Sequence, residues 1–97
     1  MRLRWSARAE RELWAVCEYI AKDKPGAADI FFTRVQARAR RVARFPQSGR
    51  QVPEIDDPSV REIFFGNYRL VYRIESGTVF ILTVFEGHRL FDPEKIK

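Results

Sequence analysis

The stretch that decides the fold is VREIFFGNYRLVYRIESGTVFILTVF, residues 60–85. It contains three runs rich in β-branched and aromatic residues, a composition typical of strands. Gly66-Asn67 and Ser76-Gly77 separate the runs, and such dipeptides suit tight hairpins because their residues can adopt positive φ. The stretch therefore predicts three antiparallel strands within about residues 60–86.

Two helices are predicted before these strands. In residues 7–21 the apolar side chains recur at helical spacing, and Ser6 is a good N-cap. Residues 23–26 break the pattern, and Pro25 suits the first position of a second helix. Because the break is short, the two helices are expected to form an antiparallel hairpin over about residues 6–44.

The remaining segments complete the expected topology. Leu3 and Trp5 alternate with arginines and predict a short first strand at the sheet edge. Residues 45–50 contain turn residues that end the helical part, and residues 51–59, with two prolines and three acids, predict an irregular or edge-like connection. Residues 92–97 predict a short polar tail. The chain is expected to form one α+β domain over residues 1–97, with order β-α-α-β-β-β. The helical hairpin packs on one face of an antiparallel sheet, and the other face carries polar and basic side chains.

Composition excludes several classes of protein. The hydrophobic fraction of 45%, with 13% aromatic residues, is enough for a packed core, so Trp5, Trp14 and Cys17 are expected in it. No apolar run is long enough to span a membrane, and no signal peptide follows Met1, so a cytoplasmic chain is expected. Cys17 and His88 are too few ligands for a zinc site, and we expect no metal and no cofactor.

Charge is distributed unevenly along the chain. Residues 1–50 hold twelve basic and five acidic residues, a net charge of +7, whereas residues 51–97 hold six and eight, a net charge of −2. Most of the bases are arginines, whose planar guanidinium suits phosphate or carboxylate. Arg34, Arg38 and Arg41 share one flank of the second predicted helix and are candidate binding residues, although such a row is more often only a solvated face.

A set of motifs occurs in a fixed order along nearly the whole chain, about residues 2–90. The motifs are Trp5-Ser6, Tyr19-Ile20, PGAA at 25–28, FPQSGR at 45–50, VPE at 52–54, Arg61-Glu62, NYRLVYR at 67–73 and GHR at 87–89. This set resembles the RelE/ParE superfamily of bacterial type II toxins. The resemblance implies a toxin that is encoded beside an acidic antitoxin and neutralised by direct binding. A toxin–antitoxin heterotetramer is compatible with this expectation.

The family divides by target, and the two branches imply different chemistry. RelE-like members cut messenger RNA on the ribosome without a metal, which requires a base, an acid and cations around one phosphate. Arg69 and Arg89 match family arginines, Arg61 lies where a catalytic lysine is common, and His88 beside Arg89 is the only histidine, the residue type most often used as a general acid or base. These four are the candidate catalytic residues of a ribonuclease, and we expect them to converge on the face of the sheet away from the helices.

Other residues favour the ParE-like branch, whose members poison DNA gyrase and are not known as nucleases. Ile63 replaces a second lysine of the ribonuclease pattern, and Lys95 replaces its tyrosine. The long second helix and residues 49–54 resemble the ParE side, so gyrase inhibition is slightly favoured. An mRNA endoribonuclease and an inactive toxin-fold module that only binds antitoxin remain the alternatives, so the chain is not assigned as an enzyme.

Four further residues are candidates for binding. They are Arg50, Glu54, Tyr68 and Tyr72. Each also has a purely structural interpretation. Arg50 and Glu54 can form a surface ion pair worth only ~0–1 kcal/mol, and aromatic packing is the more common role of a tyrosine in a half-buried strand.

Overall fold

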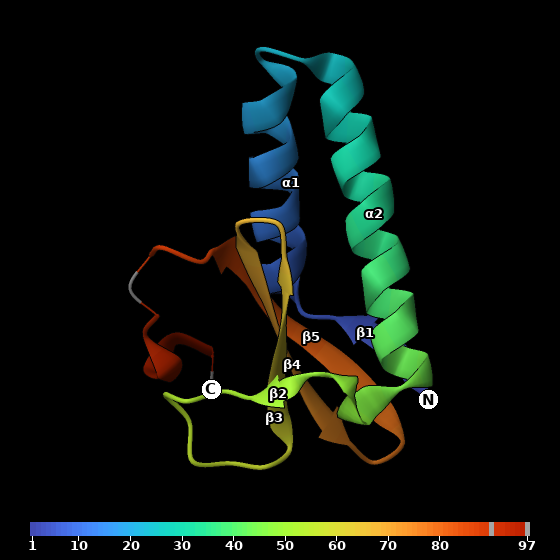
Figure 1. Ribbon diagram of the computed structural model, residues 1–97, viewed down its shortest axis with the longest axis vertical. Helices are drawn as coiled ribbons and strands as arrows, with labels where there is room; N and C mark the ends of the chain where they lie inside the picture. Colours follow the sequence, from blue (N-terminus) through green and yellow to red (C-terminus); the bar gives the residue numbers. More distant parts are fainter. Residues whose placement is uncertain (90, 97) are drawn as a thin grey trace.

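The computed structural model describes residues 1–89 and 91–96 and shows two antiparallel helices standing on a sheet (Figure 1). Helix α1 (Ala7–Ala21) begins where predicted, because the Ser6 Oγ accepts a hydrogen bond from the Ala9 N–H at 3.0 Å. Helix α2 (Pro25–Arg44) begins at the predicted proline. The predicted hairpin is confirmed, and Figure 1 shows its far end projecting beyond the sheet.

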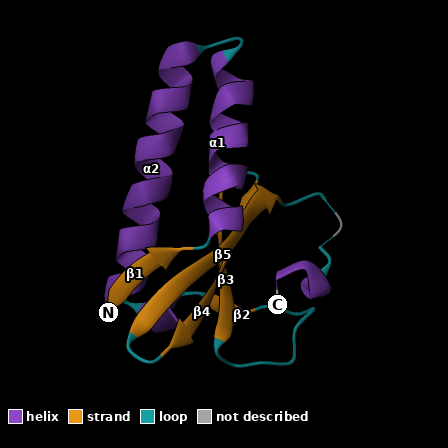
Figure 2. Cartoon of the chain, turned by 180° about the vertical axis from the view of Figure 1, so that it is seen from behind, coloured by secondary structure: helices purple, strands orange, loops and turns teal. Residues whose placement is uncertain are grey.

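Five strands form one mixed sheet in the order β1-β5-β4-β3-β2 (Figure 2). The strands are β1 (Arg2–Trp5), β2 (Arg50–Gln51), β3 (Val60–Phe65), β4 (Tyr68–Glu75) and β5 (Thr78–Glu86). The fold class and the position of β1 at an edge are confirmed. However, β1 pairs parallel to β5, so the sheet is not wholly antiparallel. The short β2 continues from a 3-10 turn, η1 (Pro46–Ser48), and pairs with β3 at the start of the connection predicted to be irregular or edge-like.

The two hairpin turns have the signs of the backbone angle φ that two-residue turns require. Ser76 and Gly77 have φ of 50° and 72°, the positive pair of a type I′ turn. In the first hairpin only Gly66 has positive φ, at 57°, which is the pattern of a type II′ turn. Both turns match the right-handed twist of their strands and fix the register of the meander.

The outer edge of β5 is closed by α1 after β1 has ended. Strand β5 contains an extra residue, Leu82, between consecutive partners of β4, and this bulge bends it past the end of β1. The Ser6 Oγ donates to the Leu82 carbonyl oxygen at 3.0 Å. The Glu12 carboxylate then accepts hydrogen bonds from the Val84 N–H at 3.3 Å and from the Thr83 hydroxyl at 2.6 Å.

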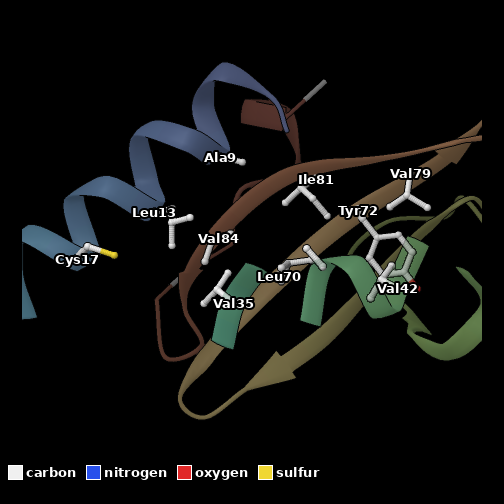
Figure 3. Close-up of a cluster of buried hydrophobic side chains, with 11 residues drawn as sticks. Ala9, Leu13, Cys17, Val35, Val42, Leu70, Tyr72, Val79, Ile81 and Val84 are labelled. Atoms are coloured by element: carbon white, nitrogen blue, oxygen red, sulfur yellow. The ribbon is translucent and has the colours of Figure 1, made fainter. Parts of the chain in front are cut away.

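The main core lies between the helices and the sheet (Figure 3). Cys17 is buried there as predicted, and Trp5 packs against this cluster. The prediction for Trp14 is wrong: its side chain is 59% exposed. Its ring stacks on Phe32 across the two helices, with centroids 5.6 Å apart, outside the core cluster. No helix in residues 1–89 and 91–96 is both long and apolar enough to cross a membrane.

A second apolar cluster covers the opposite face of the sheet. Its buried members are Val52, Val60, Val71 and Phe85, and Ile55, Leu82, Phe91 and Ile96 pack against them. The expectation of a polar and basic face is therefore wrong in part, because this face carries Arg69 and Glu62 but also a buried apolar cluster. The expected polar tail is also wrong in part, because the 3-10 helix η2 (Pro93–Ile96) folds back and packs Ile96 on this cluster. The apolar residues of these segments are widely spaced among charges, which hides them from a periodicity argument.

Candidate functional site

The most concentrated polar site lies on the sheet face away from the helices, around Arg69 of β4. Its side chain is only 8% exposed. The Arg69 Nε donates to Glu62 Oε1 at 2.8 Å, and Nη2 pairs with the same carboxylate. Nη1 and Nη2 also form a bidentate pair with Glu54, at 3.0 and 3.1 Å. All three guanidinium nitrogens are therefore bound to carboxylates of the same chain.

Three aromatic rings surround the same guanidinium. The Arg69 Cζ lies 5.9, 5.3 and 5.1 Å from the ring centroids of Phe64, Phe85 and Phe91. These distances are within the range of cation–π attraction. The hydrogen bonds to Glu54 raise the pKa of Arg69, and in turn the Arg69 donors lower the pKa of Glu54. Arg69 thus stays charged inside an apolar shell.

Glu62 is the centre of this arrangement, and the sequence did not single it out as a site residue. Its side chain is fully buried on β3. Arg50 of β2 donates from Nε to Glu62 Oε2 at 2.7 Å and lies over the Phe64 ring at 5.1 Å. We call Arg50, Glu54, Glu62 and Arg69 the arginine–glutamate network. It joins β2, β3, β4 and the loop after β2. The available signal was an acid whose same-face neighbours in the strand, Val60 and Phe64, are apolar.

Arg61 lies on the opposite face of the sheet. In the β3–β4 register Arg61 pairs with Tyr72, which belongs to the core beneath the helices, whereas Arg69 pairs with Phe64. The Arg61 Nη1 donates to the Gly49 carbonyl oxygen at 2.8 Å. The expectation that Arg61 and Arg69 converge is therefore wrong, because residues directly opposite each other share a face and these two pairs alternate.

Tyr72 supports the turn that Arg61 holds. Its hydroxyl accepts from the Gly49 N–H at 3.0 Å and donates to the Pro46 carbonyl oxygen at 2.7 Å. Burial raises the pKa of the Tyr72 hydroxyl. The residue is fully buried, so as a candidate for binding it is not available at the surface.

His88 and Arg89 lie in the turn after β5, and both are exposed. The Arg89 N–H donates to the Glu86 carbonyl oxygen at 3.0 Å. Arg89 lines a hollow of about 510 Å³ with Arg8 and Phe91, between α1 and the C-terminal segment. The four candidate catalytic residues thus occupy three different places, and a catalytic role for any of them stays a prediction.

The other candidate binding residues are spread over the helical side. Tyr68 is half-buried and packs edge-to-face on Phe31, with centroids 5.1 Å apart, and burial raises the pKa of its hydroxyl. Arg34, Arg38 and Arg41 are exposed along α2. Within the part of the chain that the structure describes, no group of three or more His, Cys, Asp or Glu side chains is placed to hold a metal ion.

Two solved structures share this fold. A chain of the structure titled "Chromosomal ParDE TA system from P. aeruginosa" superposes with a TM-score of 0.75 at 18% identity, covering 89% of this chain and 95% of that chain. A chain of the Mycobacterium tuberculosis toxin–antitoxin complex RelBE2 superposes with a TM-score of 0.61 at 26% identity, covering 88% and 95%. This chain therefore has the fold of chains found in ParDE and RelBE toxin–antitoxin structures.

Sequence comparison gives the family. The family model described as "ParE toxin of type II toxin-antitoxin system, parDE" matches residues 3–91. A Sinorhizobium fredii protein named "Putative toxin Y4kP" is 38% identical over 90 residues, which cover 91% of this chain and 90% of that protein. The chain belongs to the ParE toxin family, and the resemblance inferred from the motifs is confirmed.

Proposed function

We propose that this ParE-family toxin arrests growth by binding DNA gyrase and does not cut RNA. The observation that carries the proposal is the arginine–glutamate network. RNA cleavage needs a base, an acid and a cation at one phosphate. Arg69, the arginine that matches a phosphate contact in ribonuclease relatives, is instead bound by Glu54 and Glu62.

Releasing Arg69 to an RNA phosphate would be energetically costly. The Glu62 carboxylate is fully buried, and removing one partner of a buried ion pair costs about 3–5 kcal/mol. Arg61, on the other face of the sheet, is not placed to assist at the same phosphate. This geometry supports a toxin that acts by binding.

Two assays test the proposal, one on the purified protein with gyrase and one on messages from cells that express the protein. We expect the protein to inhibit supercoiling by gyrase, and we expect primer extension to show intact messages after growth arrest. Toxin mixed beforehand with the product of the neighbouring reading frame is the control. Unaffected gyrase at micromolar excess, or cleaved transcripts at arrest, would overturn the proposal, and harmless overexpression would favour the inactive binding module.

We further propose that an acidic antitoxin neutralises the protein through the apolar hollow between α1 and the end of the sheet. This hollow has a volume of about 430 Å³. Val16 and Tyr19 of α1, Tyr68 of β4 and Val84 of β5 line it, and Tyr19 is 74% exposed. An amphipathic segment that orders on binding would place its apolar side chains here, while its acidic residues face the basic hairpin.

Calorimetry with the purified antitoxin tests this surface. We expect Tyr19→Ser to weaken binding by at least about tenfold, as for an aromatic anchor. Ile30→Ser, which removes an apolar side chain that is 54% exposed on α2 away from the hollow, is the matched control. Equal losses from both variants, or affinity that does not change with salt, would count against this surface.

A further inference from the structure

A long segment of the chain lacks acidic residues altogether. Between Asp29 and Glu54 the sequence contains six arginines and no Asp or Glu. Five of these arginines are exposed on α2, and they are Arg34, Arg38, Arg40, Arg41 and Arg44. At 1.5 Å per residue they cover about 15 Å of the helix. We call these five the α2 arginine surface.

These arginines differ from those of the arginine–glutamate network in their partners. Arg50 and Arg69 are bound by buried or partly buried carboxylates. By contrast, among residues 1–89 and 91–96 no carboxylate forms an ion pair with any member of the α2 arginine surface. The arginines of the arginine–glutamate network are therefore neutralised by carboxylates, whereas those of the α2 arginine surface are not.

A hollow lies beside this surface, between α2 and β3. It has a volume of about 430 Å³ and is lined by Arg38, Arg41 and Ser48, with Val42 and Ile63. The Arg38 Nη2 donates to the Phe64 carbonyl oxygen at 3.2 Å, and its guanidinium lies 5.8 Å from the Phe65 ring centroid. These contacts hold the guanidinium of Arg38 at the rim before any ligand arrives.

We infer that the α2 arginine surface and this hollow bind the phosphodiester backbone of a nucleic acid. A guanidinium binds phosphate oxygens in a bidentate manner, and a backbone presents closely and regularly spaced negative charges. Phe45 follows directly after the last of these arginines and is 54% exposed, with the Arg44 guanidinium 5.5 Å from its ring centroid, so the exposed part of the ring can stack on an unpaired base. This inference does not rest on the proposed action on gyrase.

An acidic protein segment anchored on this surface alone fits less well. Protein interfaces are organised around apolar or aromatic anchors. From Thr33 to Arg44 the exposed positions of α2 carry no large apolar side chain. The exposed Trp14, Tyr19 and Ile30 lie outside this segment.

The helix dipole accounts for only part of the pattern. Arg41 and Arg44 lie in the last turn of α2, where cations stabilise the negative end of the helix. Arg34 and Arg38 lie before that turn, and the dipole effect fades within it. Arg34, Arg38 and Arg41 share one flank of the helix, and a ligand-binding role explains them together with the hollow that Arg38 and Arg41 line.

The test is fluorescence anisotropy on the purified full chain with four labelled probes of similar length. These are a DNA duplex, a DNA single strand, an RNA strand of the same sequence and polyglutamate. For Arg38→Gln/Arg41→Gln we expect the dissociation constant for the best nucleic-acid probe to rise by at least about tenfold. The slope of log K against log salt should fall by about 2, since two phosphate contacts are lost.

Lys22→Gln/Lys24→Gln is the matched control, because it removes the same net charge from exposed positions at the far end of the hairpin. We expect it to retain nearly wild-type affinity. The probe bound most tightly identifies DNA or RNA as the source of the backbone. Equal losses in both variants, an unchanged salt slope, or equally tight binding of polyglutamate would overturn the inference. Thermal unfolding verifies the fold. Arg34→Gln/Arg41→Gln, which leaves the Arg38 contacts intact, is the second variant with the same expected loss.

Discussion

The carboxylate of Glu62 and the guanidinium of Arg69 pair across strands β3 and β4 on the sheet face that the helices do not cover. Both side chains are buried, and three phenylalanine rings surround the arginine. A position that resembles a phosphate contact in ribonuclease relatives therefore serves internal packing in this chain. Four predictions test this interpretation of the site and its surroundings.

The first prediction concerns the buried carboxylate. We expect Glu62→Ala to lower the free energy of unfolding by about 3–5 kcal/mol, because Arg69 is left charged in an apolar shell. Urea denaturation measures the loss. Glu54→Ala is the matched control and should cost less, since the Glu54 side chain is 37% exposed. Equal losses would contradict the central role of Glu62, whereas the double change Glu62→Leu/Arg69→Met should recover most of the stability.

The second prediction is a pH dependence of stability. Hydrogen bonds from Arg69 hold the pKa of Glu54 below its ordinary 4.5. Because the folded pKa is lower than the unfolded one, the Glu54 carboxylate stabilises the fold above about pH 4.5. This contribution is lost as the pH falls through the folded pKa.

Urea unfolding at a series of acidic pH values measures this effect. Glu54→Gln should have a flatter dependence than the wild type. A residual slope should remain in the variant, because hydrogen bonds from Ser59 also lower the pKa of Asp57. Superimposable curves for the two proteins would show that Glu54 does not contribute.

The third prediction concerns the space around Gly49. A Cβ at this position would lie 2.7 Å from the Glu62 carbonyl oxygen and closer still to the Tyr72 hydroxyl. We expect Gly49→Ala to destabilise the protein by about 1–3 kcal/mol, as overpacking does. Gly26→Ala, which meets nothing within 4 Å in the first turn of α2, should instead be neutral or stabilising by up to about 1 kcal/mol. Thermal unfolding of the two variants decides the point.

The fourth prediction concerns Cys17. Burial, and secondarily Asp29, raise the pKa of its thiol, so the reactive thiolate is scarce at neutral pH. A thiol reagent should therefore modify the native protein slowly and the urea-unfolded protein rapidly. Equally fast labelling of both states would mean that the α1–α2 hairpin opens readily.

Local signals predicted most of the fold. Ser6 and Pro25 mark the helix starts, and the dipeptides at 66–67 and 76–77 mark the hairpins, because caps and turns depend on neighbouring residues alone. The exposure of Trp14 and the return of η2 to the sheet were missed. Both depend on how far the helices and the tail extend relative to the sheet, which no short pattern encodes.

The site was less predictable than the fold for the same reason. Arg50, Glu54 and Arg69 were chosen as functional residues, but the network that they form with Glu62 joins four separate segments. The separation of Arg61 from Arg69 follows only from the β3–β4 register. A shift of that register by one residue would move each side chain of one strand to the opposite face of the sheet. Composition and spacing alone therefore do not determine which of these side chains lie together.

The Glu12 carboxylate that binds the Val84 N–H acts as a substitute for the backbone of a sixth strand. The unpaired backbone groups of an exposed edge strand can pair with another copy of the chain and cause aggregation. Here a side chain from a neighbouring helix occupies one of these groups without adding another strand. Glutamine at position 12 would still supply an acceptor oxygen, whereas alanine would leave the Val84 N–H without its hydrogen-bond acceptor. A toxin altered in that way would be prone to aggregate whenever its concentration exceeds that of the protein that restrains it.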